Sequence, residues 1–138
     1  MHYHKELLVR FAHCDPAGIV FYPRYFEMIN GIVEDWFEEG LEISFSGLLH
    51  HRQLVTPTVH FDVDFVQPSN MGDRITFRLC VTKIGKSSFG LDIQVSCQGE
   101  VRLNIKQTLV FTDPHAKSTV PIPPDIIKRM TLFLAPHA

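Results

Sequence analysis

The 138-residue sequence predicts an α+β fold, in which one long helix lies across a curved antiparallel sheet of about five strands. Two patterns carry this prediction. Apolar residues recur every three to four positions from Pro23 to Glu39, and four stretches of period-two alternation follow Pro57. The breaks between the last strands are short, and short connections join antiparallel neighbours. At this length and 45% hydrophobic content, we expect residues 1–138 to form a single domain.

The N-terminal segment predicts the first strand over residues 3–11, because Leu7 and Val9 alternate onto the same side as Phe11. Only a few apolar residues precede Arg10, too few for a signal-peptide core or a membrane span. We therefore expect a cytoplasmic protein that has no membrane partner.

The long helix is predicted over Pro23–Glu39. Its apolar stripe consists of Phe26, Ile29, Val33, Trp36 and Phe37. Pro23 suits the first helical position, where no amide hydrogen is required, and Gly40 supplies the stop. Such a helix is about 25 Å long, comparable with the width of five strands at about 4.8 Å each.

The remaining elements follow from the same two periods. A short helix is expected within residues 43–52, with Phe45, Leu48 and Leu49 facing inward. The later strands are expected at residues 59–65, 74–81, 89–97 and 101–111, each with one buried face, and a terminal helix at residues 123–133. A sheet of this kind has open edges, and pairing of edges in a dimer is one way to protect them.

Composition narrows the class of ligand. The net charge of −2 and a pI near 6.4 exclude the basic surface that nucleic acid requires, which favours a small molecule. Three cysteines without a C-x-x-C pair predict reduced thiols. No metal site is expected, because His50 and His51 point in different directions and His13 with Asp15 lacks a third ligand.

The segment from Arg10 to Tyr25 places an acid in a tight polar loop directly before the helix. Pro16 and Gly18 allow the chain to fold sharply around Asp15. The first turn of the helix has orphan N–H groups that carry partial positive charge and can hold an oxyanion. The alternative is that Asp15 only caps backbone amides. For Cys14 we expect a buried structural thiol, since the adjacent acid would raise a thiol pKa.

The motif Cys14-Asp15-Pro16-Ala17-Gly18-Ile19-Val20, followed by Tyr22-Pro23 and Tyr25, resembles that of the hot-dog fold acyl-CoA thioesterases, most closely the 4-hydroxybenzoyl-CoA thioesterase group. Thr56-Pro57 and Lys86-Ser87-Ser88-Phe89 support the resemblance, which covers nearly the whole chain. It implies that Asp15 is the catalytic carboxylate and that the Tyr22 backbone N–H polarises the thioester carbonyl. Where many broader relatives carry a histidine, this chain has Pro23.

The resemblance also implies how substrate is bound. The expected substrate contacts are Gly18, Phe21, Tyr25, Thr56, Lys86, Ser87 and Ser88. Of these, the aromatic residues near the helix start belong to an acyl pocket that a neighbouring subunit completes, and the 86–88 turn holds the nucleotide. Coenzyme A is part of the substrate, so no cofactor is expected. The resemblance further implies a homodimer or a homotetramer.

The predicted activity is hydrolysis of an acyl-CoA, either an aromatic one similar to 4-hydroxybenzoyl-CoA or a short one. Asp15 acts in it as nucleophile or as general base, and the sequence does not separate these routes. One alternative is a non-catalytic module that binds acyl-CoA or acyl-carrier protein. Another is a hot-dog hydratase or dehydratase, which needs a histidine beside the acid; only His13 or His60 could serve.

Overall fold

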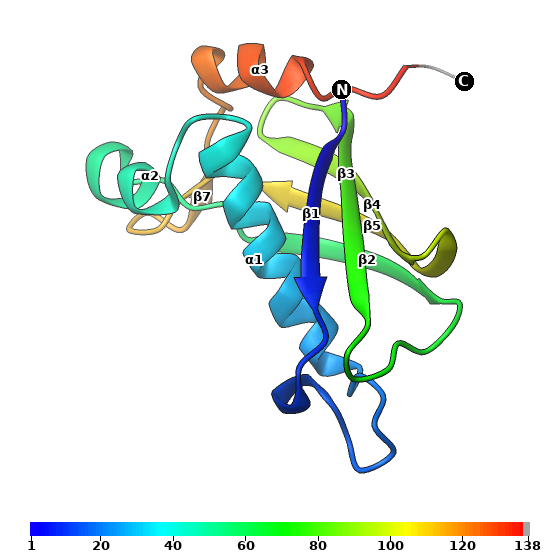
Figure 1. The fold of residues 1–138 in the computed structure, drawn as a ribbon. Coiled ribbons are helices and arrows are strands. Elements are labelled where there is room, and N and C mark those ends of the chain that lie inside the picture. The colour runs from blue at the N-terminus through cyan, green and yellow to red at the C-terminus, as the bar shows by residue number, and fades with distance from the viewer. Residues whose placement is uncertain (137–138) are drawn as a thin grey trace.

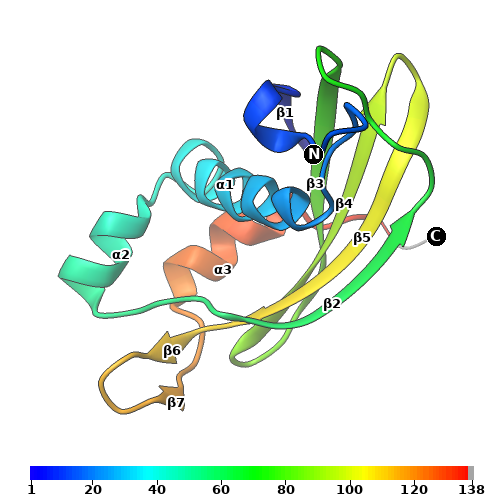
Figure 2. The same cartoon turned by 90° about the horizontal axis from the view of Figure 1, so that it is seen from below.

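A five-stranded antiparallel sheet curves around one long helix, α1, in the structure, a computed structural model that describes residues 1–136 (Figures 1 and 2). The strand order in space is β1-β3-β4-β5-β2. The strands are β1 (Tyr3–Leu8), β2 (Thr58–Phe65), β3 (Arg74–Ile84), β4 (Ser88–Cys97) and β5 (Glu100–Val110). This architecture confirms the predicted α+β fold.

Helix α1 spans Pro23–Glu39, the range that the apolar stripe predicts. Trp36 and Phe37 are fully buried, and they pack against Phe89 of β4 with ring centroids 6.3 and 6.2 Å away. Burying an aromatic side chain of this size stabilises the fold by about 1.5 to 3 kcal/mol. The buried face is wider than the predicted stripe, because Tyr25, Met28 and Ile32 are also buried.

Gly40 ends α1 for a different reason than the one expected. Its φ of −93° is not left-handed, so the helix end does not need glycine for backbone conformation. A Cβ at this position would instead lie 2.8 Å from Cδ1 of Trp36 and 2.9 Å from Cζ of Phe133. Glycine is required because the C-terminal segment packs closely against the end of the helix.

Strand β1 is shorter than predicted. It pairs with β3 from Tyr3 to Leu8, and then the Val9 N–H donates to the Asp73 carbonyl (2.8 Å). The chain leaves the sheet there and forms a 3₁₀ turn, η1 (Phe11–His13). Phe11 is 81% exposed, so the prediction that it shares the buried face with Leu7 and Val9 was wrong.

Strand β2 lies at an edge of the sheet, beside β5, and the 66–73 segment connects it to β3. Its apolar face is only partly covered. Phe61 and Val63 are half-buried, whereas Val59 and Phe65 are 59% and 52% exposed. The expected buried face is therefore incomplete, because an edge strand has a neighbour on one side only.

Smaller elements complete the fold. Helix α2 (Phe45–Arg52) begins at Ser44, whose side chain accepts from the Gly47 N–H, and it buries Leu48 but leaves Leu49 39% exposed, against expectation. The terminal helix α3 spans Pro124–Thr131. A short hairpin of β6 (Thr112–Asp113) and β7 (Ser118–Thr119) was not predicted. Among residues 1–136, no helix has the length and apolar content of a membrane span.

Candidate active site

The loop before α1 folds tightly around Asp15. One carboxylate oxygen, Oδ1, accepts a hydrogen bond from the Ala17 N–H (2.9 Å), and the Asp15 carbonyl accepts from the Gly18 N–H (3.0 Å). Gly18 has a φ of +79°, a conformation that glycine adopts without strain. Asp15 is half-buried, and its second oxygen, Oδ2, has no hydrogen-bond partner within residues 1–136. The carboxylate is thus oriented by one oxygen and free at the other.

The 66–73 segment holds this loop in place. The Val20 N–H donates to the Ser69 carbonyl (3.0 Å), and the Met71 N–H donates to the Gly18 carbonyl (2.9 Å). Both bonds join residues far apart in sequence. They fix the chain at the end of the turn and just after it, so the position of Asp15 depends on the 66–73 segment as well as on its own loop.

The backbone at the start of α1 leaves one amide unused. The other amides of this segment are occupied. The Phe21 N–H donates to the His13 carbonyl, the Arg24 N–H to the Phe21 carbonyl and the Tyr25 N–H to the Tyr22 carbonyl. Pro23 has no N–H. The Tyr22 N–H has no acceptor within residues 1–136. It is therefore available to an outside acceptor at the positive end of the helix dipole, the arrangement expected of an oxyanion donor.

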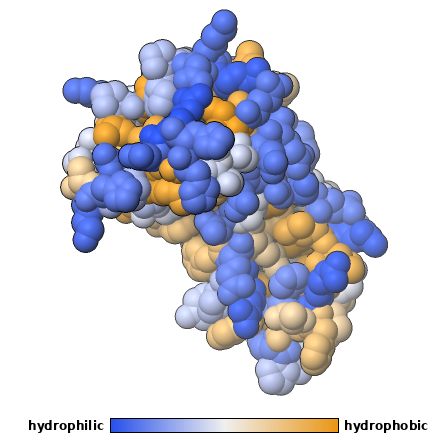
Figure 3. Space-filling view, turned by 90° about the vertical axis from the view of Figure 1, so that its left-hand side faces the viewer, coloured by the Kyte–Doolittle hydropathy of each residue, from blue (hydrophilic) through white to orange (hydrophobic). Residues whose placement is uncertain are grey.

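Aromatic side chains surround this helix start. Phe21 and Tyr22 are 46% and 60% exposed, and the Tyr22 ring lies 6.4 Å from that of Phe65 on β2. A hollow of about 250 Å³ lies between α1 and the end of β2. On the face shown in Figure 3, apolar side chains are exposed over the lower part of the molecule. Tyr25 differs from its neighbours: it is 4% exposed, and burial raises the pKa of its phenol. It contributes to the core as well as to the wall of the hollow.

The second group of predicted residues lies at the other end of the helix. Thr56 is next to Pro57, whose carbonyl accepts from the Val110 N–H, and Val110 pairs with Ser88. The Ser87 carbonyl accepts from the Phe111 N–H, and Phe111 packs against Phe37. Tyr22 and Phe37 are separated by about 22 Å along the helix axis. Within one chain, the Thr56 and Lys86–Ser88 group is therefore not brought together with Asp15.

Three other residues considered from the sequence are Cys14, His13 and His60, and only Cys14 differs from its expected burial. Cys14 is half-buried rather than buried, and its Sγ donates to the Arg10 carbonyl (3.4 Å). His13 Nδ1 accepts from the Arg10 N–H (2.9 Å), which occupies one of its two ring nitrogens. His60 is exposed on the edge strand. Neither histidine is hydrogen-bonded to Asp15.

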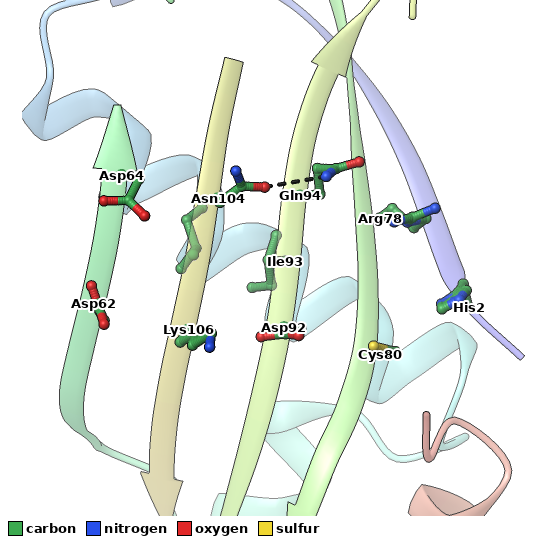
Figure 4. A pocket seen from close by; sticks show the side chains of 11 residues that line it. His2, Asp62, Asp64, Arg78, Cys80, Asp92, Ile93, Gln94, Asn104 and Lys106 are labelled. Atoms are coloured by element: carbon green, nitrogen blue, oxygen red, sulfur yellow. Dashed lines mark hydrogen bonds between the residues drawn. The ribbon is translucent and has the colours of Figure 1, made fainter. Parts of the chain in front are cut away.

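A separate hollow of about 310 Å³ lies on the outer face of the sheet (Figure 4). Charged side chains alternate across it, since Lys106 pairs in register with Asp92 on one side and Asp62 on the other. These charges offset one another. None of the predicted site residues lies there, because α1 covers the opposite face (Figure 2).

Arg102 contributes to the site but was not predicted from the sequence. Arg102 on β5 is 9% exposed and donates from Nη1 to Asp73 Oδ2 (2.9 Å) and to the Pro68 carbonyl (2.9 Å). It thereby binds the segment that holds the Asp15 loop. In the sequence Arg102 takes a polar position of the alternation, as Asn104 and Lys106 do, so no local signal distinguishes it.

Comparison with known proteins identifies the fold and the family. The model of the thioesterase-like superfamily matches residues 9–130. A 1,4-dihydroxy-2-naphthoyl-CoA hydrolase of Nostoc punctiforme is 30% identical over 123 residues, which cover 87% of this chain and 80% of that protein.

Two solved structures are similar over nearly the whole chain. A gentisyl-coenzyme A thioesterase is 26% identical, with a TM-score of 0.80 and coverage of 92% of this chain and 99% of the other. A 4-hydroxybenzoyl-CoA thioesterase, solved with 4-hydroxybenzoyl-CoA, is 23% identical, with a TM-score of 0.86 and coverage of 94% and 98%. The latter is a structural neighbour, so the comparisons confirm the resemblance at the level of the superfamily. The chain belongs to the thioesterase-like superfamily and is, as predicted, a thioester hydrolase of the hot-dog fold.

Proposed function

We propose that this enzyme hydrolyses aromatic acyl-CoA thioesters at the start of α1, with Asp15 as the catalytic carboxylate. The observation that carries the proposal is that the loop before α1 and the start of α1 each leave one polar group unused. Among residues 1–136 the Tyr22 N–H has no acceptor and the Asp15 Oδ2 has no donor, while hydrogen-bonded backbone holds both groups. Hydrolysis of a thioester needs a hydrogen-bond donor of this kind at the carbonyl oxygen, and a carboxylate near the carbonyl carbon that acts as nucleophile or general base.

The Tyr22 N–H stabilises the negative charge that develops on the carbonyl oxygen. Asp15 then acts by one of two routes. As a nucleophile it attacks the acyl carbon and expels the CoA thiolate, and water cleaves the resulting anhydride. As a general base it takes a proton from water, which attacks the same carbon, and the proton is passed to the leaving thiolate. Both routes yield a free acid and CoA thiol.

The aromatic acyl preference is supported by the relatives and by the surroundings of the site. The Nostoc punctiforme relative is named for a dihydroxynaphthoyl thioester. In this chain Tyr22 and Phe65 border the hollow at the helix start, and the Phe21 ring packs edge to face against that of Tyr22. Offset and edge-to-face contacts with such rings favour a flat aromatic group.

A second copy of the chain completes the site in this proposal. The outer edge of β2 is unpaired in one chain, and antiparallel pairing of two such edges about a two-fold axis places the Phe65 end of one strand beside the Thr58 end of the other. Tyr22 contacts the Phe65 end, whereas Thr56 and the 86–88 turn lie at the Thr58 end. The nucleotide-binding turn of one copy then approaches the Asp15 loop of the other.

The proposal is tested by incubating the purified protein with aromatic and aliphatic acyl-CoAs and following release of free thiol. Release of thiol from aromatic thioesters, faster than from aliphatic ones, is the expected result. Thermal stabilisation by acyl-CoA without thiol release would instead identify a binding module. Loss or gain of a double bond in an enoyl-CoA or 3-hydroxyacyl-CoA, without thiol release, would identify a hydratase or dehydratase.

A further inference from the structure

Gln107 on β5 is a polar residue at an inward-facing position of the sheet. It is 4% exposed, in line with the buried Ile105 and Leu109. Its Nε2 donates to Thr58 Oγ1 (2.9 Å), whereas its Oε1 is buried and has no hydrogen-bond partner within residues 1–136. Leaving a buried acceptor unpaired destabilises the folded state, so this amide requires an explanation beyond packing.

The unpaired amide lies at a hollow of about 290 Å³ between α1 and the edge strand β2. The hollow is lined by Phe26, Glu27, Asn30, Thr58, Phe61 and Gln107. Phe61 is the direct cross-strand neighbour of Gln107, and the Phe26 and Phe61 rings meet edge to face, 5.2 Å apart. The wall is thus aromatic with a buried amide at its base, which suits a flat ring that carries a polar substituent.

This hollow is the next one along α1 and β2 from the hollow at the helix start, and the two have no lining residue in common. As α1 runs forward from Tyr22, its contacts on β2 run backward: Tyr22 meets Phe65, and Phe26 meets Phe61. Asn30 lies two helical turns beyond Tyr22, about 12 Å along the axis. A hydrogen bond at each end occupies about 3 Å, which leaves roughly the length of one aromatic ring with its substituent.

We propose that Gln107 is a specificity-determining residue that accepts a hydrogen bond from a hydroxyl group on the ring of the acyl substrate. The inference rests on the proposed function and deepens it: the substrates are CoA thioesters of ring-hydroxylated aromatic acids. A hydroxyl supplies the donor that the buried Oε1 lacks. An unsubstituted ring leaves the same oxygen unpaired, and sites built to bind a substrate hydroxyl discriminate strongly against analogues without it.

The test compares substrates that differ only in the hydroxyl, benzoyl-CoA against its monohydroxylated forms and 2-naphthoyl-CoA against its 1,4-dihydroxylated form. The wild type is expected to prefer the hydroxylated member of a pair in kcat/KM. Gln107→Met keeps the length of the side chain without its hydrogen-bonding groups. We expect it to lower this preference by about 10- to 100-fold, as loss of one buried hydrogen bond does.

Gln94→Met is the matched control. Gln94 lies on the neighbouring strand β4, and its Nε2 donates to Asn104 on the outer face of the sheet (3.2 Å; Figure 4). The same substitution there is expected to leave the substrate preference unchanged. Thermal melting compares the folding of both variants with that of the wild type, and Gln107→Leu replaces Gln107→Met if the latter does not fold.

An unchanged preference in folded Gln107→Met, or a wild type without any preference for hydroxylated rings, would overturn the proposal. Calorimetric Kd values for the same CoA thioesters in Asp15→Asn and in the Asp15→Asn, Gln107→Met double variant form a second readout. If the wild type hydrolysed no aromatic thioester, the proposed function would fail. The ratio of Kd values would still decide whether Gln107 recognises a hydroxyl.

Discussion

Arg102 and Asp73 form a largely shielded ion pair, with Arg102 Nη1 2.9 Å from Asp73 Oδ2 and side-chain exposures of 11% and 25%. The pair ties β5 to the 66–73 segment. That segment in turn holds the Asp15 loop through Ser69 and Met71. A contact distant from Asp15 in sequence therefore positions the candidate active site.

This pair predicts a pH-dependent contribution to stability. The Asn70 N–H, first, and then the Arg102 guanidinium hold the pKa of the Asp73 carboxyl below its ordinary value. Because folding lowers this pKa, ionised Asp73 contributes to the free energy of unfolding. The contribution is complete above the ordinary carboxyl pKa of about 4 and is lost as the pH falls through the pKa of the folded state. We expect Asp73→Asn to lower the free energy of unfolding by about 2 kcal/mol at pH 7.

Urea unfolding of the wild type and Asp73→Asn between pH 7 and pH 3 checks this prediction. The two stability curves should converge on the acidic side. Curves that stay parallel down to the lowest pH would mean that Asp73 has the same pKa in the folded and unfolded chain.

Asp15→Asn separates the catalytic role of this residue from a capping role. Asparagine can still accept the Ala17 N–H with its side-chain oxygen, so the loop is expected to keep its shape. The variant loses only the basic carboxylate. We expect kcat to fall at least about 100-fold, the lower end of what positioned acid–base groups supply. Asp62→Asn, on the outer sheet face, is the control. Near-normal turnover in Asp15→Asn would leave capping as the role of this residue.

The proposed oxyanion donor can be removed by proline, although it is a backbone group. Tyr22 has a φ of −52°, close to the value that a proline ring imposes. Tyr22→Pro therefore removes the free N–H at a compatible conformation. We expect a loss of about 2.7 to 4 kcal/mol of transition-state stabilisation, or 10²- to 10³-fold in kcat.

Tyr22→Ala is the matched control for this experiment, because it removes the aromatic ring but keeps the N–H. Its kcat should stay well above that of Tyr22→Pro, with circular dichroism used to compare the folding of the two. Equal losses in both variants would assign the effect to the ring and not to the amide.

Lys86→Ala tests the turn proposed to hold the nucleotide. The Lys86 carbonyl accepts from the Ile122 N–H (2.8 Å), so the backbone bond that fixes the turn survives removal of the exposed side chain. We expect KM for a CoA thioester to rise about 3- to 10-fold, as for loss of one exposed phosphate contact, with kcat little changed. Lys128→Ala, on α3, is the control. A fall in kcat at constant KM would remove Lys86 from substrate binding.

The elements that the sequence predicted well are those determined locally. Helix α1 has its apolar stripe and its Pro23 start within its own residues, and its predicted bounds are those observed. Strand β1 ends at Leu8 because the Asp73 N–H, opposite Val9, donates to the Asn70 carbonyl within its own turn and not to β1, an interaction that no local pattern reveals. Arg102 lies at a β-bulge, where Val95 pairs with Leu103 but Ser96 with Val101, and strict alternation fails at such a position.

The candidate site likewise has features determined by adjacent residues and features that depend on distant ones. The Asp15 turn and the free Tyr22 N–H follow from adjacent residues, so the sequence could anticipate them. The separation of the Lys86 turn from Asp15 depends on how the sheet lies along α1. Gln107 falls in phase with Ile105 and Leu109 on the predicted buried face of the 101–111 strand, and its unpaired oxygen becomes evident only once Thr58 and Phe61 are placed beside it.

The open edge of β2 predicts the assembly. Val59 is 59% exposed on this strand, beside a row of backbone groups that no strand within residues 1–136 covers. We expect a dimer in solution, and Val59→Lys should shift it toward monomer, because lysine on an edge strand opposes strand pairing.

Light scattering after gel filtration measures the mass, and thiol release measures activity. Activity should fall with the dimer fraction, since the Lys86 turn of one copy is needed beside the Asp15 loop of the other. Leu132→Lys is the control at a similarly exposed position, 52% exposed beyond α3. A fully active monomer would show that one chain contains the whole site.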